Sequence, residues 1–485
     1  MNVVVNGWVW LPKSELTSAQ QAKIKKQLTV VPRKMSDFGG KPPAPVRLYA
    51  DKNGMLGVPR GFFRAKSRRS PEQNLDVSDG SKMNPHIISL MRSDGPYAEQ
   101  GKALDVMAKY TTDHQWGGFL LQAGCGFGKT NVALEFAFRL RRSTLILVHK
   151  EFFLRQWKER IELFFPGAKV GIVRQDKCDY EGKDFVIAMM QSIARDTGSK
   201  YPKEFYSAFG MVVSDECHRI GAATWAGVVP RFNARWRLGL TATPRRKDGA
   251  EQVFFHHLGS VLYKAQSKGL VPDVKTIVSQ SRLKPARVAG KMVQPSDLKH
   301  VHVLAQLVQD PIRNKSITDL VARYADAGRK VMVVSERLKH LSALHALLTP
   351  AMVRLNKVIS IGYYVGGKSE DELKESERAN VILATKQMIE EGLDIPAVDV
   401  LLMATPMSDV EQTVGRARRF CKPSKSKCEH LCPWRAGTCE GKPKPIIVDI
   451  RDVEILQARK KRSRRLHFYR DIGAKVEHSN PYEGR

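Results

Sequence analysis

The sequence predicts an α/β protein with two consecutive domains built on parallel sheets, preceded by a small α+β domain. Short apolar runs alternate with helical patterns from about residue 90 to 265, and the same alternation returns after residue 325. This alternation is typical of β–α–β units, whose parallel strands are covered by helices on both faces. A chain of 485 residues also has room for about three domains of roughly 150 residues each.

Residues 1–80 are expected to contain the small N-terminal domain and a linker. An apolar, partly alternating run extends from Val3 to Trp10, and a polar helical pattern follows near residues 18–27. Asn53 and Gly54 separate two further apolar runs, and this dipeptide favours a β-hairpin because both residues tolerate a positive φ. Residues 66–81 are polar, charged and rich in turn formers, which predicts a linker.

The two larger domains are predicted over residues 81–268 and 326–485, with a connector over residues 269–325. The connector is expected to begin as irregular chain and to end in two helices, near residues 300–309 and 312–325. Strands are expected near residues 145–148, 185–188, 211–213 and 238–240 in the first domain, and near residues 331–334, 381–384, 400–403 and 446–449 in the second.

The charge of the chain favours a polyanionic partner. Its 80 lysines and arginines exceed its 49 aspartates and glutamates by 31. Positive surface releases the counterions of phosphates, so a nucleic acid is the expected partner, against the alternative of a basic surface that only maintains solubility. No apolar run approaches the roughly 20 residues of a membrane span, and no secretion signal is expected. Seven cysteines, an odd number in a long chain, favour a reducing compartment without a disulfide framework.

A glycine-rich segment follows an apolar strand at residues 119–121 and opens a helix, which is the context of a phosphate-binding loop. Backbone N–H groups can close around phosphates at such a helix N-terminus. Lys129 can reach the β- and γ-phosphate oxygens, and the Thr130 hydroxyl can bind Mg²⁺. An ordinary glycine-rich turn is the alternative. The expected ATP-binding residues of this loop are Ala123, Gly124, Cys125, Gly126, Phe127, Gly128, Lys129 and Thr130.

Two adjacent carboxylates follow another apolar strand, at the sheet edge where ligand sites form. Asp215 is expected to hold Mg²⁺, directly or through water, and Glu216 to polarise the water that attacks the γ-phosphate. The alternative is that the two residues are acidic only because a strand end meets solvent. Together with the loop, the pair predicts a centre for ATP hydrolysis.

Three further motifs follow in order: Thr241-Ala-Thr-Pro244, Gly392-Leu-Asp-Ile-Pro396 and Gln412-Thr-Val-Gly-Arg-Ala-Arg-Arg419. With the loop and the Asp-Glu-Cys-His box at residues 215–218, this order resembles the superfamily 2 helicases over about residues 90–450. The resemblance implies two RecA-like domains around a cleft for ATP and Mg²⁺. It also implies that ATP hydrolysis drives movement on a nucleic acid.

The resemblance implies roles for individual residues. Gln100 resembles the glutamine that reads adenine, and Gly392 and Asp394 belong to a motif of the ATP site. The set expected to bind the nucleic-acid backbone is His149, Lys150, Gln191, Ser192 and Thr385, and the set expected to couple hydrolysis to domain movement is His218, Thr241 and Thr243.

Three residues of the last motif resemble catalytic residues. Gln412 lies in this motif, and Arg416 and Arg419 resemble arginine fingers that reach the γ-phosphate from the second domain. An arginine is always charged, and its fork of donors matches phosphate oxygens. A solvated basic helix face is the alternative for the two arginines.

Within the superfamily, the Asp-Glu-Cys-His box and residues 240–249 and 310–314 are most similar to phage branch-migration helicases and to translocases of the xeroderma pigmentosum group B type. This implies duplex or branched DNA as the substrate, an N-terminal domain that binds DNA, and a role in DNA repair or recombination. A monomer in the cytoplasm of a bacterium or a phage-infected host is expected. An RNA helicase and a non-catalytic nucleic-acid-binding scaffold are the alternatives.

Four cysteines cluster in a predicted insertion over residues 421–444, where a related helicase usually has a short loop. They lack the tight pairs of common zinc knuckles, but four soft ligands in a basic, proline-rich segment favour a structural zinc ion. An iron–sulfur cluster and unliganded thiols are the alternatives. The four are Cys421, Cys428, Cys432 and Cys439.

A second basic run lies at residues 459–465, on the expected final helix. Its cations are expected to contact phosphates, with a solvated helix face as the alternative. Cys125 and Cys217, inside the nucleotide motifs, are expected to be buried thiols.

Overall fold

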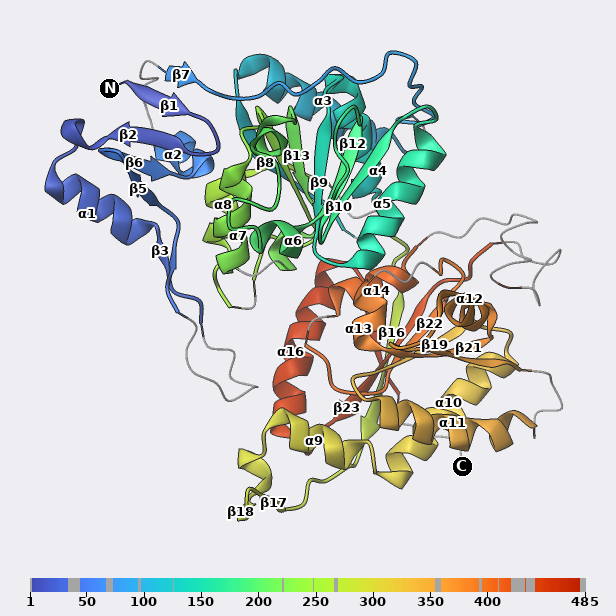
Figure 1. The fold of residues 1–485 in the computed structure, drawn as a ribbon. Helices are drawn as coiled ribbons and strands as arrows, with labels where there is room; N and C mark the ends of the chain where they lie inside the picture. The colour runs from blue at the N-terminus through green and yellow to red at the C-terminus, as the bar shows by residue number, and fades with distance from the viewer. Residues whose placement is uncertain are drawn as a thin grey trace. The chain divides into compact units, whose positions relative to one another are not determined.

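The computed structural model divides into two compact units, Met1–Ser267 and Lys268–Arg485 (Figure 1). The structure describes residues 2–33, 44–66, 73–94, 97–124, 126–219, 222–246, 248–265, 269–353, 359–391, 395–408, 410–419, 432 and 441–479. Within these ranges, no helix is long and apolar enough to cross a membrane.

The larger sheet of the first unit has eight strands in the order β11-β10-β12-β9-β13-β14-β8-β15. All neighbouring strands are parallel except β10 and β11. Continuous apolar runs such as that of β9 are buried on both faces, as a sheet covered by helices requires. The strands are β8 (Gly117–Gln122), β9 (Thr144–Val148), β10 (Val170–Arg174), β11 (Lys177–Cys178), β12 (Phe185–Met189), β13 (Met211–Ser214), β14 (Trp236–Thr241) and β15 (Val261–Lys264).

Each face of this sheet has its own apolar core under a layer of helices (Figure 1). Successive side chains of a strand point to opposite faces, so Leu145 of β9 joins the core with α6, α7 and α8, while Ile146 joins the core with α3, α4 and α5. The helices are α3 (Ala98–Asp113), α4 (Lys129–Leu140), α5 (Glu151–Phe164), α6 (Met190–Ala194), α7 (Ala222–Val228) and α8 (Gln252–Leu258).

The N-terminal domain packs onto the face that carries α8. Its sheet has the order β5-β6-β2-β1-β7, and Val3 belongs to the same apolar core as the α8 side chains. The buried Arg60 guanidinium donates to the carbonyls of Ala234 and Arg235, both at 2.7 Å. The expected hairpin at Asn53 is confirmed, with a φ of 49° at that residue. The elements are β1 (Val3–Val5), β2 (Val9–Pro12), α1 (Ser18–Gln27), β3 (Thr29–Val30), β4 (Val46–Arg47), β5 (Ala50–Lys52), β6 (Met55–Val58), α2 (Arg60–Lys66) and β7 (Gln73–Leu75).

Residues 73–83 run along the edge of the larger sheet at which its strands begin. After β7 pairs with β1, isolated bridges join Ser78, Gly80 and Lys82 to residues just before β14, β13 and β9. Gly80 has a φ of 61°, and a Cβ atom there would lie 2.3 Å from the Gly210 nitrogen. The turn-forming composition of this segment therefore serves backbone pairing at a sheet edge.

The second unit contains a parallel sheet in the order β20-β21-β19-β22-β23-β16-β24. The strands expected in this domain are present. β16 corrects the prediction of an irregular connector, because Val274 and Ile277 are buried while β16 pairs with strands on both sides. Its alternation with polar residues, including Lys275, hid this strand among loop-like residues. The strands are β16 (Asp273–Ser279), β19 (Val331–Ser335), β20 (Ile361–Tyr364), β21 (Val381–Thr385), β22 (Val400–Met403), β23 (Ile446–Asp452) and β24 (Lys475–Ser479).

Two buried ion pairs fasten helices to β23 of this sheet. Arg313 of α10 pairs with Asp452 at 2.9 Å, and Arg465 of α16 pairs with Asp449 at 2.8 Å. The two helices expected at the end of the connector are confirmed as α9 and α10. The helices are α9 (His300–Leu307), α10 (Pro311–Asp326), α11 (Leu338–Val353), α12 (Glu370–Arg378), α13 (Lys386–Glu391), α14 (Glu411–Ala417) and α16 (Leu456–Asp471), and a hairpin of β17 (Ala286–Val288) and β18 (Lys291–Val293) precedes α9.

Candidate functional site

The expected phosphate-binding loop connects the end of β8 to the start of α4. Gly126 and Gly128 have φ values of 85° and 89°, which favour glycine. A Cβ atom at Gly128 would also lie 2.7 Å from the Gln100 amide nitrogen. The loop therefore needs glycine for both its turn and its packing, and it leads directly into the N-terminus of a twelve-residue helix. Cys125 lies outside the described residues.

Lys129, the first residue of α4, points back across this loop. Its Nζ atom donates a hydrogen bond to the Ala123 carbonyl at 3.0 Å and lies 3.9 Å from Oε1 of Glu216. The helix N-terminus and the ammonium group both attract anions. The structure therefore brings the expected phosphate-binding lysine to the expected catalytic carboxylate.

Asp215 follows β13 and is buried beneath α5. One carboxylate oxygen accepts a hydrogen bond from Trp157 Nε1 at 2.8 Å, and the other accepts from the Glu216 N–H at 2.9 Å. Burial, and next the charge of Glu216, raise the pKa of Asp215 to about 6. A cation bound here would offset that burial and favour the ionised carboxylate. The donor set at this position therefore fits a hard cation such as Mg²⁺.

Glu216 has a φ of 44°, a value that a non-glycine residue adopts rarely. This turn directs its side chain toward both Lys129 and His218, and its Oε2 atom lies 3.4 Å from His218 Nδ1. His218 Nδ1 also lies 2.9 Å from the Thr241 hydroxyl, which donates to the Thr243 carbonyl at 2.8 Å. The three residues expected to couple hydrolysis to movement therefore form a chain of contacts that begins at Glu216.

Three residues make contacts at this site that were not predicted from the sequence. Trp157 of α5 donates a hydrogen bond to Asp215, although it belongs to none of the predicted motifs. Arg246 donates to the His218 carbonyl at 3.2 Å and pairs with Asp248 at 2.7 Å. Gln100 donates to the Phe127 carbonyl at 2.7 Å, so it contacts the loop itself. The contact of Arg246 could have been predicted from residues 240–249. An arginine and an aspartate two positions apart can form an ion pair next to the Asp-Glu-Cys-His box.

The four residues of the first unit expected to bind nucleic acid lie after β9 and β12. The Gln191 amide donates to the His149 carbonyl at 2.7 Å, which brings these two segments together. Lys150 precedes α5 and is half-buried. Ser192 is buried, and its hydroxyl accepts from the Gln175 N–H at 2.9 Å. The Ser192 side chain is therefore used inside the protein.

The remaining expected residues belong to the second unit. Thr385 ends β21, and Gln412, Arg416 and Arg419 are half-buried on α14 or just after it. Arg418, between the two expected fingers, is buried and donates to the Leu270 carbonyl at 2.9 Å. A backbone carbonyl of the same unit therefore holds the Arg418 guanidinium in place. Gly392 and Asp394 lie outside the described residues.

Only Cys432 of the four clustered cysteines is described, and it is buried in the apolar core of the second unit. Cys421, Cys428 and Cys439 lie outside the described residues. In the part of the chain that the structure describes, no three His, Cys, Asp or Glu side chains gather as a metal-binding group. The zinc prediction therefore receives no support here. Cys217 is buried as expected, and burial raises its pKa.

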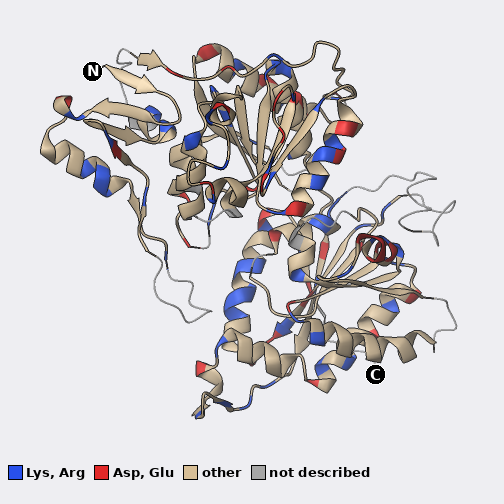
Figure 2. Ribbon diagram, in the orientation of Figure 1, with Lys and Arg blue, Asp and Glu red and all other residues tan. Residues whose placement is uncertain are grey.

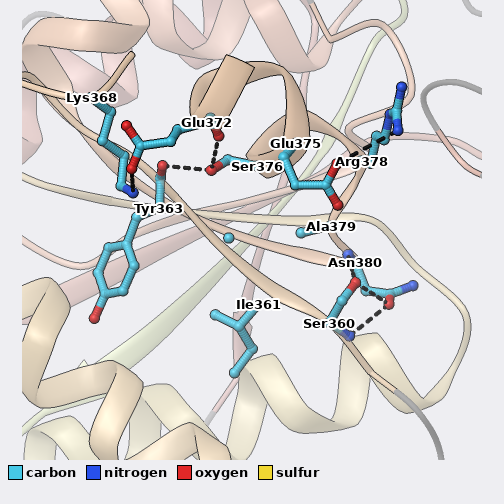
Figure 3. A pocket seen from close by; sticks show the side chains of 11 residues that line it. Ser360, Ile361, Tyr363, Lys368, Glu372, Glu375, Ser376, Arg378, Ala379 and Asn380 are labelled. Carbon is cyan, nitrogen blue, oxygen red and sulfur yellow. Dashed lines mark hydrogen bonds and ion pairs between the residues drawn. The ribbon is translucent and has the colours of Figure 1, made fainter. Parts of the chain in front are cut away.

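A cavity of about 570 Å³ lies between β20 and α12 (Figure 3). Lys368 faces Glu372 at 2.8 Å, and the Ser376 hydroxyl donates to the Tyr363 carbonyl at 2.7 Å. The Ser376 hydrogen bond holds α12 to the strand, and the Lys368–Glu372 pair lies at the start of the helix. None of the expected site residues lines this cavity, so it is separate from the candidate site.

Several known proteins similar to this chain are named as helicases. Residues 95–246 match the family described as "Type III restriction enzyme, res subunit". The chain is 29% identical over 442 residues to "Putative ATP-dependent RNA helicase L396" of Acanthamoeba polyphaga mimivirus, covering 89% of this chain and 78% of that protein. It is 25% identical over 333 residues to "Probable helicase D10" of Escherichia phage T5, covering 67% and 66%.

A solved structure of S. cerevisiae Dbp5 bound to RNA and ADP BeF3 shares the fold, with a TM-score of 0.50 and 11% identity. The similarity covers 80% of this chain and 90% of that one. The α/β prediction with RecA-like domains is therefore confirmed. Membership of a helicase family also implies ATP and Mg²⁺. The motifs, the loop geometry and these relatives together show that the chain belongs to the superfamily 2 helicases, which are nucleic-acid-dependent ATPases.

Proposed function

We propose that this helicase hydrolyses ATP at Lys129, Asp215 and Glu216 to drive movement on duplex or branched DNA. The observation that carries the proposal is the approach of Lys129 Nζ to Glu216 Oε1, at 3.9 Å, beside the buried Asp215 carboxylate. Phosphoryl transfer needs positioning and charge neutralisation more than covalent chemistry. A lysine, a helix N-terminus and two carboxylates supply these at one edge of the sheet.

Each residue of the centre has a separate task. The N–H groups at the start of α4 and the Lys129 ammonium bind phosphate oxygens. Glu216 orients the attacking water and accepts its proton. Thr130 and Asp215 would hold Mg²⁺, which neutralises phosphate charge when it is bound. The contacts from Glu216 through His218 to Thr241 would then transmit a change at the catalytic carboxylate to β14.

The arginine fingers are proposed to be Arg416 and Arg419. Among the described residues, the Nε atom of Arg416 is buried without a hydrogen-bond partner. Such a buried donor is expensive unless a ligand satisfies it. Arg418 donates to a backbone carbonyl instead, so the proposal assigns the phosphate contacts to Arg416 and Arg419 on either side of it. An arginine on the second unit would make hydrolysis depend on closure of the two domains.

DNA is proposed as the substrate on the resemblance of the motif strings to phage branch-migration helicases, and RNA is the second candidate. The name of the mimivirus relative, an RNA helicase, favours the second. The excess of 31 positive charges suits either polyanion. The experiment is ATP hydrolysis measured with single-stranded DNA, duplex DNA, a four-way junction and RNA of matched length. Stimulation by duplex or junction supports the proposal, and stimulation by RNA alone contradicts it.

A structural zinc ion is a further part of the proposal. Its support is the grouping of Cys421, Cys428, Cys432 and Cys439 within one short segment. Four thiolates around one zinc would contribute folding free energy to a polar segment. Elemental analysis is expected to give about one zinc ion per chain, and Cys432→Ser should lose it while ATP binding persists. A chain purified without zinc or iron contradicts the metal site, and iron would indicate a cluster instead.

A further inference from the structure

The α16 helix is the most basic element of the second unit (Figure 2). Residues 455–470 contain seven lysines and arginines and no aspartate or glutamate. The exposed cations Arg459, Lys460 and Arg464 recur at the spacing of one helix face. An ordinary solvated helix intersperses acidic residues among its basic ones, whereas the one acidic residue of α16 is Asp471 at its end.

The opposite face of α16 is fixed to the sheet. The buried Arg465 guanidinium binds the Asp449 carboxylate through two hydrogen bonds, at 2.9 and 2.8 Å. The Tyr469 hydroxyl donates to the same carboxylate at 3.2 Å. These contacts set the rotation of the helix about its axis. The basic face is therefore held outward by the fold.

The β17–β18 hairpin extends this basic surface. Its apolar side chains pack in one small cluster with Ile455 and Ala458, at the start of α16. The Gln457 amide donates to the Leu298 carbonyl at 3.2 Å, which joins the helix to the segment after the hairpin. Arg287 and Lys291 of the hairpin are exposed. Two elements far apart in the sequence thus carry cations on one contiguous part of the unit.

A further arginine of α16 lies close to other positively charged side chains. Arg462, on the same helix, is half-buried, and its Nε atom has no hydrogen-bond partner among the described residues. Burial, and next the charge of the neighbouring Arg451, lower the pKa of Arg462. The nearby Asp449 carboxylate opposes this effect, but it is already bound by the Arg465 guanidinium, so the repulsion between Arg451 and Arg462 prevails. A bound anion would relieve that repulsion.

We propose that the exposed face of α16 and the β17–β18 hairpin form a surface that binds the sugar–phosphate backbone of a nucleic acid without reading its sequence. No residue of this surface belongs to the helicase motifs. The inference rests on the proposed function, because it supplies a second contact with the same polymer. Such a contact would hold the second unit on its track during steps in which the motif residues release it.

The experiment compares three variants of the full chain in binding to duplex DNA, single-stranded DNA and RNA without nucleotide. The first carries R459Q, K460Q and R464Q, and the second carries R287Q and K291Q. The control loses three exposed cations elsewhere on the second unit, as many as the first variant, through K315Q, K339Q and K374Q. Dissociation constants are measured from about 50 to 200 mM salt.

Each phosphate contact contributes about 0.9 to the slope of log affinity against log salt on duplex DNA. The α16 variant should therefore lose about two to three from this slope and the hairpin variant about one to two, while the control keeps the wild-type slope. Basal ATP hydrolysis without nucleic acid should be unchanged in all three. An unchanged slope in the α16 variant overturns the surface. Absence of ATP hydrolysis in the wild type would instead contradict the proposed function, and the binding slopes would still decide this inference.

Discussion

Two buried carboxylates at comparable places in the two sheets differ in their partners. Asp449 lies on β23 and binds the guanidinium of Arg465 through both oxygens. Asp215 lies just after β13, and within the described part of the chain its hydrogen bonds come from neutral donors, Trp157 and the backbone of Glu216. A buried charge is tolerated when it is paired. The paired carboxylate is therefore structural, and the one without an arginine is the one available to a metal ion.

The largest expected effect concerns the residue beside the available carboxylate. Glu216→Gln should abolish ATP hydrolysis and leave ATP binding largely intact, because an amide keeps the shape but cannot accept the proton of water. Lys129→Ala should weaken nucleotide binding as well. Phosphate release and binding of a fluorescent nucleotide separate the two outcomes. Near-normal turnover of Glu216→Gln would show that the attacking water is activated elsewhere.

Three adjacent arginines provide a second comparison. Arg416→Ala or Arg419→Ala should lower turnover by a large factor, on the order of 10³, as expected of an arginine finger. Arg418→Ala should act mainly on stability, because its guanidinium is buried and donates to the Leu270 carbonyl. Turnover and melting temperature are measured for all three. If Arg416→Ala weakened binding to nucleic acid and kept basal hydrolysis, these arginines would be phosphate contacts of the track instead.

A third experiment replaces each of the two buried aspartates with asparagine in a separate variant. Asp449→Asn leaves the Arg465 guanidinium buried without its charge partner, at a cost of about 3 to 5 kcal/mol. Asp215→Asn leaves no buried cation without a partner, and the Trp157 N–H can still donate to the new amide oxygen. Hydrogen exchange of the β23 and β13 amides reports each unit separately. Equal loss of protection in both variants would contradict the distinction between the paired and the available carboxylate.

The sequence predicted the parts of the site that are local in the chain. Lys129 and Asp215 each follow an apolar strand, and parallel strands bring such ends to one sheet edge. Trp157 could not be predicted, because only the packing of α5 places its N–H against a carboxylate. β16 was missed for a related reason, since its burial depends on partners that lie near the end of the chain. What the sequence hid is what depends on distant neighbours.

The smallest expected effect is a difference in pH dependence. Burial raises the pKa of Asp215 to about 6, above its ordinary value of 3.8. The folded protein therefore holds this proton more tightly than the unfolded chain, so the contribution of Asp215 to stability is fully present below pH 3.8 and is lost as the pH rises through about 6. Asp215→Asn removes this titration.

Without Mg²⁺ or nucleotide, protection of the β13 amides should fall between about pH 4 and 6 in the wild type more steeply than in Asp215→Asn. Saturating Mg²⁺ should reduce the difference, because a bound cation favours the ionised carboxylate and competes with the proton. Identical pH profiles for the two proteins would mean that Asp215 is as well compensated as Asp449. The available carboxylate would then have to be sought elsewhere in the site.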